Sequence, residues 1–83
     1  MTPDTEQRLR ELIADVLALD PAEVGEDTST DTVDGWDSLA HMNLVLALEE
    51  AFEITIPDEE SADLTSYPLI RLVVAEQLAA IAP

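Results

Sequence analysis

Apolar residues near the start of the chain recur at the intervals of an amphipathic helix. They follow the i, i+3, i+4, i+7, i+8 spacing that places them on one face, and they are Leu9, Leu12, Ile13, Val16 and Leu17. Thr2 with Pro3 behind it, or Thr5, is suited to cap the start of this helix. The helix is expected to end near Leu19, because a residue before proline, here Asp20, disfavours helical backbone.

The polar stretch that follows predicts a long first loop. Residues 21–24 are expected to form one short helical turn with Asp20 as its cap, and residues 25–37 consist mainly of Gly, Thr, Ser, Asp and Glu. Counted from Asp20, the connection has about 18 residues, more than the few that usually join elements of a compact domain. Val33 and Trp36 indicate that part of this loop packs on the core.

Two more helices are predicted after the loop. The first spans residues 38–52, and both Asp37 and Ser38 are suited to cap it. The second is short, with Asp58 as its cap and its end near Leu64.

A last helix completes the predicted fold. Thr65 or Ser66 caps it, and Pro68 lies in its first turn. Its expected core face consists of Ile70, Val74, Leu78 and Ile81. No strong alternation of period two occurs, so the prediction is an all-α fold with three main helices, one short third helix and a long first loop.

The helix over residues 38–52 has more apolar residues than one core face needs. On a helical wheel, one stripe is formed by Leu44, Val45, Leu48 and Phe52, which we assign to the core. The opposite side combines apolar residues with carboxylates: Leu39, Met42, Leu46, Glu49, Glu50 and Glu53. This side is either buried against another segment or exposed as a docking surface for a basic partner. The charge of the chain favours the docking surface.

That charge is strongly negative. The chain has 19 Asp and Glu, three Arg and no Lys, for a formal charge of −16, and sixteen of the acids lie between Arg10 and Arg71. Binding to the nucleic-acid backbone or to an anionic membrane depends on Lys and Arg. Nucleic acids and anionic membranes are therefore excluded as partners. The absence of Cys excludes disulfides, a thiolate nucleophile and a cysteine zinc site. We expect no metal site.

Length and composition indicate one folded domain over residues 1–83. The 47% of apolar residues argues against disorder despite the charge. No apolar run is long enough to cross a membrane, and the first residues lack the basic start of a secretory signal. Met1 and Pro83, which follows the last apolar residues, suggest a complete small gene product. We expect a soluble, cytoplasmic monomer.

A serine follows the loop at the start of the second main helix. The stretch Gly35-Trp36-Asp37-Ser38-Leu39 places its hydroxyl where backbone N–H groups and the helix dipole favour a phosphate. A simple N-cap serine is the alternative interpretation.

The wider sequence resembles the acyl carrier proteins. The matching segments are Asp37-Ser38-Leu39, Leu44 and Val45, Leu48-Glu49-Glu50, Phe52, Ile54, Ile56-Pro57-Asp58-Glu59-Glu60 and Leu64-Thr65. Residues 12–19 with the following loop also look like the first helix and loop of that family. The resemblance covers essentially the whole chain.

The resemblance implies a four-helix bundle that carries 4′-phosphopantetheine, donated by coenzyme A, on Ser38, with Asp37 and Leu39 beside it. Acyl groups then travel as thioesters on the terminal thiol of the arm. The family also implies docking through Leu39, Met42, Leu46, Glu49, Glu50 and Glu53. Expected partners are a phosphopantetheinyl transferase and acyltransferase, ketosynthase or acyl-loading enzymes with basic surfaces. The chain itself would hold no catalytic residue.

Three positions depart from the commonest form of the family. Carriers of primary fatty-acid synthesis often have an acidic residue at the position of Asn43 and a small one at that of Trp36, and His41 is unusual. Trp36 is interpreted as a loop anchor and His41 as a partly buried packing residue, with a role in recognising cargo as its alternative. The departures favour a discrete carrier of polyketide or other specialised biosynthesis over a fatty-acid carrier. The acidic helix and Asp37 favour an acyl carrier over a peptidyl or aminoacyl carrier.

Other functional classes fit the sequence less well. Ser38 and His41 lie three residues apart on one helix without a Gly-x-Ser-x-Gly turn, which argues against a hydrolase triad. An EF-hand starting at Asp27 would have Thr32 where Gly is required and Ser38 where Glu is required. An acidic interaction module that leaves Ser38 unmodified remains the rival from another class.

Overall fold

Four α-helices and one short 3-10 turn follow one another in the computed structural model, which describes residues 1–81. Their bounds are α1 Pro3–Leu17, η1 Pro21–Glu23, α2 Ser38–Phe52, α3 Asp58–Ser61 and α4 Tyr67–Ile81. Within residues 1–81 there is no β-strand, only an isolated bridge between Ser29 and Ser66. The predicted all-α fold with a short third helix and a long first loop is confirmed. Pro83 lies outside the described residues.

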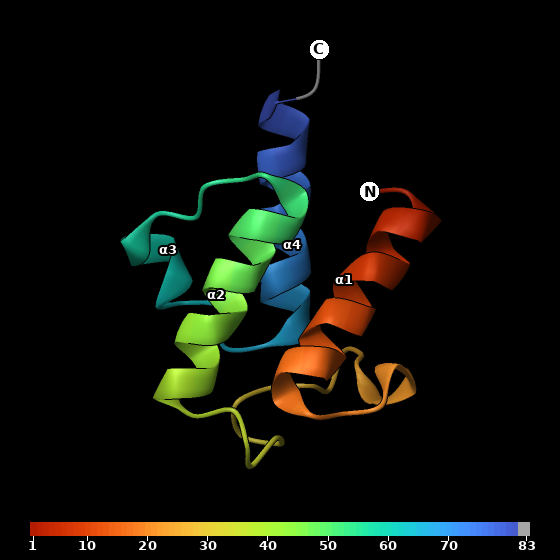
Figure 1. The fold of residues 1–83 in the computed structure, drawn as a ribbon, viewed down its shortest axis with the longest axis vertical. Coiled ribbons are helices and arrows are strands. Elements are labelled where there is room, and N and C mark those ends of the chain that lie inside the picture. Colours follow the sequence, from red (N-terminus) through yellow and green to blue (C-terminus); the bar gives the residue numbers. More distant parts are fainter. Residues whose placement is uncertain (82–83) are drawn as a thin grey trace.

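The three long helices form a bundle with the short helix at its side. Figure 1 shows α2 and α4 running in one direction and α1 in the opposite one. α1 packs against α2, and α2 packs against α4. The loop between α1 and α2 crosses the end of the bundle where α2 begins, and α3 lies beside α2 (Figure 1).

The limits of α1 follow from local hydrogen bonds. The Thr2 hydroxyl accepts from the Thr5 amide at 3.2 Å, so Thr2 is the cap. At the other end Ala18 adopts the left-handed conformation with φ 58°, and the Leu19 amide donates to the Ala14 carbonyl at 2.8 Å. This reversal ends α1 at Leu17, so the predicted end near Leu19 was two residues late.

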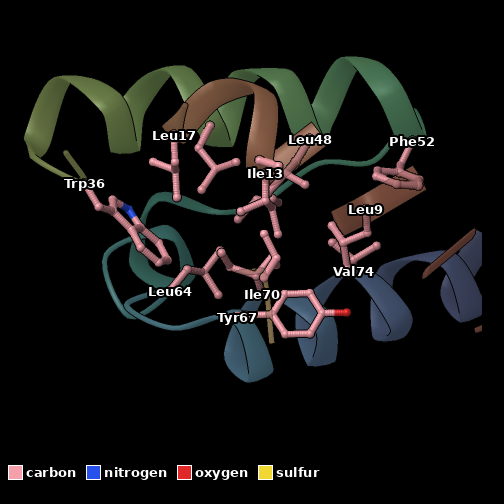
Figure 2. Close-up of a cluster of buried hydrophobic side chains, with 14 of the residues drawn as sticks. Leu9, Ile13, Leu17, Trp36, Leu48, Phe52, Leu64, Tyr67, Ile70 and Val74 are labelled. Atoms are coloured by element: carbon pink, nitrogen blue, oxygen red, sulfur yellow. The ribbon is translucent and has the colours of Figure 1, made fainter. Parts of the chain in front are cut away.

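The core lies between the helices and extends into the loop. Figure 2 shows Trp36 at one end of the buried cluster and Phe52 at the other. The buried apolar residues are Leu9, Ile13, Ala14, Leu17, Val24, Trp36, Leu44, Leu48, Phe52, Ile54, Ile56, Leu64, Tyr67, Ile70 and Val74. The predicted core stripe of α2 is confirmed, with Val45 only partly buried. Trp36, Phe52 and Tyr67 are the buried aromatic side chains, and each contributes a large apolar area to this small core.

The long loop is fixed to the start of α4. The Thr30 amide donates to the Thr65 carbonyl, and the Tyr67 amide donates to the Thr28 carbonyl, both at 2.9 Å. The buried Thr28 hydroxyl also donates to the Glu23 carbonyl at 3.0 Å and accepts from the Gly25 amide at 2.9 Å. These bonds satisfy the backbone of a segment that has no regular partner, so the loop has a defined path.

Three further details of the predicted helices were wrong. Asp58 is the first residue of α3 and not its cap, which is Pro57 without a side-chain hydrogen bond, and α3 ends at Ser61 instead of near Leu64. Ile81 is 58% exposed although it continues the core face of α4. Figure 1 explains this, because the last turn of α4 extends beyond the ends of α1 and α2 and has no helix to pack against.

The few cations of the chain connect helices. Arg71 Nε pairs with Glu6 Oε2 at 2.6 Å, and the Tyr67 hydroxyl donates to the same oxygen at 3.4 Å while it accepts from Arg10 Nε at 3.3 Å. Arg8 donates to the Ala51 carbonyl at the end of α2 at 3.1 Å. The ion pair found in residues 1–81 joins Arg71 to Glu6, so no acid of α2 is paired with an arginine there.

Removing the Glu6 carboxylate is expected to lower stability in a pH-dependent way. The hydrogen bond from Arg71, with its charge and that of Arg10, holds the pKa of Glu6 below its ordinary 4.5 against the opposing effect of desolvation. The stabilisation is therefore complete above about pH 4.5 and is lost as the pH falls through the lowered pKa. Glu6→Gln should reduce the Tm by a few degrees at pH 7. At the acid end of a pH series the Tm of the variant should equal that of wild type. A difference in Tm that persists at the acid end contradicts this account.

Candidate functional site

Ser38 is exposed at the first position of α2 because Asp37 caps the helix. Asp37 has extended backbone, with φ −96° and ψ −174°, and its Oδ1 accepts from the Ala40 amide at 2.9 Å. A carboxylate at this position also interacts favourably with the helix dipole. The interpretation of Ser38 as a simple N-cap is wrong, so its hydroxyl is not needed to satisfy the helix backbone.

Trp36 holds the loop immediately before Ser38 against the core. The indole is 5% exposed, and its Nε1–H donates to His41 Nδ1 at 3.1 Å. The two rings stack with centroids 6.2 Å apart and planes at 24°. Trp36 is therefore the loop anchor that the sequence predicts, and it is tied to the first turns of α2.

His41 continues this chain of contacts to α3. Its Nε2 lies 2.6 Å from the Ser61 carbonyl oxygen, and the side chain is half-buried. The indole N–H of Trp36 only donates and the carbonyl of Ser61 only accepts. The two partners therefore place the proton of the ring on Nε2, which donates to the Ser61 carbonyl. The lone pair of Nδ1 accepts the hydrogen bond from Trp36. His41 thus connects the loop, α2 and α3.

A groove of about 570 Å³ runs beside Ser38. It lies between the end of the loop, the start of α2, and the segment around α3. Its lining residues are Thr30, Trp36, Asp37, Ser38, His41, Met42, Ser61, Ala62 and Thr65. Thr30, Ser61 and Thr65 were not found by sequence reasoning, because each lies in a separate polar segment without a periodic pattern that points toward Ser38.

The second stripe of α2 faces solvent. Leu39, Met42 and Leu46 are 68%, 62% and 56% exposed, so the alternative of a helix buried on both sides is wrong. Single exposed leucines are common, but three on one helix face next to Ser38 form a continuous apolar strip. The strip begins one residue after Ser38 and continues along the outer side of α2.

The three carboxylates assigned to the same side have different surroundings. Glu50 is exposed. Glu49 is half-buried, and its Oε2 accepts from the Ile56 amide at 2.9 Å, which fixes the segment after α2. Glu53 is the C-cap of α2 in the left-handed conformation with φ 53°. The expected site residues thus lie on one side of α2, but only Glu50 among these acids has no backbone role in the described contacts.

Residues 1–81 contain no group of three or more His, Asp or Glu side chains arranged to hold a metal ion. Over the same residues no helix has the length and apolar character needed to cross a membrane.

Comparison with known protein families identifies the family of this chain. A sequence model described as "Phosphopantetheine attachment site" matches residues 7–78, which include the loop, α2, α3 and most of α4. The chain belongs to this family. It is therefore a carrier protein with a 4′-phosphopantetheine prosthetic group, and it is not an enzyme in its own right.

A solved structure agrees with this assignment. The chain is similar to a holo acyl carrier protein from Geobacter metallireducens, whose structure was determined by solution NMR. The two share 30% sequence identity over 88% of this chain and 84% of that chain, with a TM-score of 0.79. The four-helix fold of acyl carrier proteins is confirmed for this carrier.

The described residues fit a covalently attached arm. A phosphodiester requires an accessible hydroxyl, and Ser38 offers one on a helix of 15 residues whose cap is already supplied by Asp37. The groove beside Ser38 has room for part of a flexible chain. In such carriers the arm supplies a terminal thiol, which this chain lacks because it has no Cys.

Proposed function

We propose that this carrier bears 4′-phosphopantetheine on Ser38 and presents thioester-bound acyl groups to partner enzymes. The observation that carries the proposal is the exposure of Ser38 at the start of α2, directly beside the exposed apolar strip of the same helix. Asp37 caps the helix, and the backbone N–H groups of the first turn favour a phosphate oxygen. The chain positions the attachment point, and the partner enzymes perform the chemistry.

Docking is proposed to use the outer side of α2. Leu39, Met42 and Leu46 offer apolar contact area, while Glu50 and its neighbours steer a basic partner by charge. A transferase must reach the Ser38 hydroxyl, and any surface that does so meets Leu39 first. The proposed partners are a phosphopantetheinyl transferase and acyltransferases, ketosynthases or acyl-loading enzymes.

The proposed pathway is polyketide or related specialised biosynthesis. Trp36 and His41, which differ from the usual residues of fatty-acid carriers, form one hydrogen-bonded unit next to Ser38. Because these two unusual residues make a specific contact beside the proposed attachment point, they support a role in specialised biosynthesis.

The attachment is tested by mass spectrometry. Purified protein is incubated with coenzyme A and a broad-specificity phosphopantetheinyl transferase, and the intact mass is measured. We expect a complete shift by one phosphopantetheine group. An unchanged mass under conditions that modify another carrier in the same tube overturns the proposal and favours the acidic interaction module.

Charge reversal at Glu50 is expected to slow loading. Glu50→Lys places a positive charge in the path of a basic partner, and we expect the rate to fall by about threefold to tenfold at low salt. The effect should shrink as salt rises, because the charges are screened beyond about 10 Å at 0.1 M. Loading is followed by mass spectrometry over time.

Glu76→Lys is the matched control for this change. Glu76 is an exposed acid on another helix, α4, and its reversal alters the net charge equally. Equal slowing by both variants would indicate a general charge effect and contradict a docking role of Glu50. Glu49 is unsuitable for this experiment because its carboxylate holds the Ile56 amide.

A further inference from the structure

Three aspartates outside the helices are followed by a backbone amide that is already hydrogen-bonded. The amides of Thr28, Thr32 and Leu64, which each follow an aspartate, donate to backbone carbonyls at 3.0, 3.1 and 3.3 Å. Asp34 is different, because in the described part of the chain neither its carboxylate nor the next amide, that of Gly35, has a hydrogen-bond partner. The two groups that can react with each other at this position are therefore both free.

Asp34 and Gly35 form the tip of an exposed turn. The Trp36 amide donates to the Val33 carbonyl at 3.1 Å, so Asp34 and Gly35 are the two central residues of a β-turn. Both are exposed, so water reaches the turn. The space around Gly35 is open, since a Cβ placed there would meet only the Leu17 carbonyl oxygen, at 3.9 Å. Glycine itself has no Cβ to hinder an approach to its nitrogen.

The other loop aspartates lack this combination. Asp37 is also followed by a small residue, Ser38, but its Oδ1 accepts from the Ala40 amide at 2.9 Å, which commits the carboxylate to the cap of α2. Asp20 precedes a proline, whose nitrogen carries no hydrogen. Asp34 thus has the greatest freedom to turn its carboxyl carbon toward the next amide nitrogen.

We propose that Asp34–Gly35 is a site of spontaneous covalent modification, at which aspartate converts to isoaspartate through a succinimide. The amide nitrogen of Gly35 gives its proton to solvent and bonds to the side-chain carboxyl carbon of Asp34, and a C–O bond of that carboxyl breaks to release water. Water then adds to the main-chain carbonyl carbon of Asp34 in the ring, and the bond from this carbon to the Gly35 nitrogen breaks. One water leaves and one enters, so the mass is unchanged and no oxidant or reductant is needed.

The product lengthens the main chain by one carbon next to the Trp36 anchor. The chain then runs through the side chain of Asp34, so the turn closed by the Trp36 amide loses its geometry. Trp36 is 5% exposed and lies two residues before Ser38, so a changed turn shifts the segment that leads into α2. We expect loading to slow on the order of tenfold, because a misplacement of about 1 Å can cost as much as about 100-fold in rate. This effect on loading rests on the proposed attachment at Ser38, whereas the isomerisation does not.

Ageing of the purified protein in warm neutral buffer tests the site. Fresh and aged protein are incubated with a protein isoaspartyl methyltransferase and S-adenosylmethionine, which label isoaspartate, and fragmentation of the proteolytic peptides locates it. We expect isoaspartate to accumulate at position 34 more than at any other aspartate, with no change of intact mass. Aged protein without isoaspartate at position 34, or with as much at Asp37, overturns the proposal.

Gly35→Ala and Asp34→Glu are the matched controls. Gly35 has no positive φ and has room for a Cβ, so alanine fits the turn but crowds the amide nitrogen. Glutamate keeps the charge but needs a six-membered ring, which closes more slowly. Both variants should age without isoaspartate at position 34 and should keep their rate of loading.

Loading of aged wild type completes the test. It should show a slow phase whose amplitude matches the fraction of isoaspartate at position 34. Loading without a slow phase, or a slow phase of equal size in aged Gly35→Ala, overturns the link between the turn and Ser38. Fresh protein that gains no mass is instead the failure of attachment, and methyl labelling still decides the modification of Asp34.

Discussion

Replacing Ser38 by alanine is expected to abolish incorporation of 4′-phosphopantetheine completely. The hydroxyl oxygen of Ser38 is the atom that would bond to phosphorus, and alanine offers no substitute at this position. The fold should survive, because Asp37 and not Ser38 caps α2 and because the side chain is exposed. The change in unfolding free energy is expected to stay within about 0.5 kcal/mol. Intact mass and the circular dichroism melting curve measure the two effects.

Ser61→Ala provides the matched control for this loss. Ser61 lines the same groove, but its contact with His41 uses the backbone carbonyl, which alanine retains. Its hydroxyl donates only to the Asp58 carbonyl within α3, at 2.9 Å. This variant should gain the full mass shift. Modification that persists in Ser38→Ala would place the attachment on another residue and contradict the assignment of the site.

Shortening Leu44 to alanine is expected to have the largest effect on stability. Leu44 is fully buried in the middle of the core face of α2. Large-to-small changes of this kind cost about 2–5 kcal/mol, because burial is lost and a cavity remains. At about 0.05–0.15 kcal/mol per residue the whole domain has only about 4–12 kcal/mol. We therefore expect the Tm to fall by about 10–25 °C.

Leu46→Ala is the same chemical change two residues further along α2. Leu46 is 56% exposed, so its truncation should leave the Tm within a few degrees of wild type. Its loss should instead weaken docking, with a rise of about fivefold in the KM of the transferase, the ratio that corresponds to ~1 kcal/mol. Equal losses of stability in both variants would contradict the assignment of the two faces.

The parts of the fold that depend on local pattern were predictable from sequence. The bounds of α2 were predicted without error, since the loop before Asp37 and the apolar period from Leu39 to Phe52 define both ends. The cap at Asp20 and the exposed strip of α2 were predictable for the same reason: each depends on residues within a few positions. Ile81 was predicted to be buried but is exposed. The helical period indicates on which face of α4 a residue lies, whereas burial also requires a neighbouring helix at the same level of the bundle.

The surroundings of the candidate site were only partly predictable. The helix position of Ser38 and the anchoring role of Trp36 follow from nearby residues. The bond between His41 and the Ser61 carbonyl does not, because it joins residues 20 positions apart through a backbone atom, which carries no side-chain signature. The role of Glu49 was missed in the same way, since its partner is the Ile56 amide.

Trp36 is the only tryptophan of the chain, and it lies two residues before Ser38 with its ring against His41. The tryptophan fluorescence of the protein therefore originates at one place, next to the proposed attachment point. Emission wavelength and quenching report on whether the indole is buried and bonded, without any added label. The emission of Trp36 thus offers a label-free signal with which loading at the neighbouring Ser38 can be followed in real time.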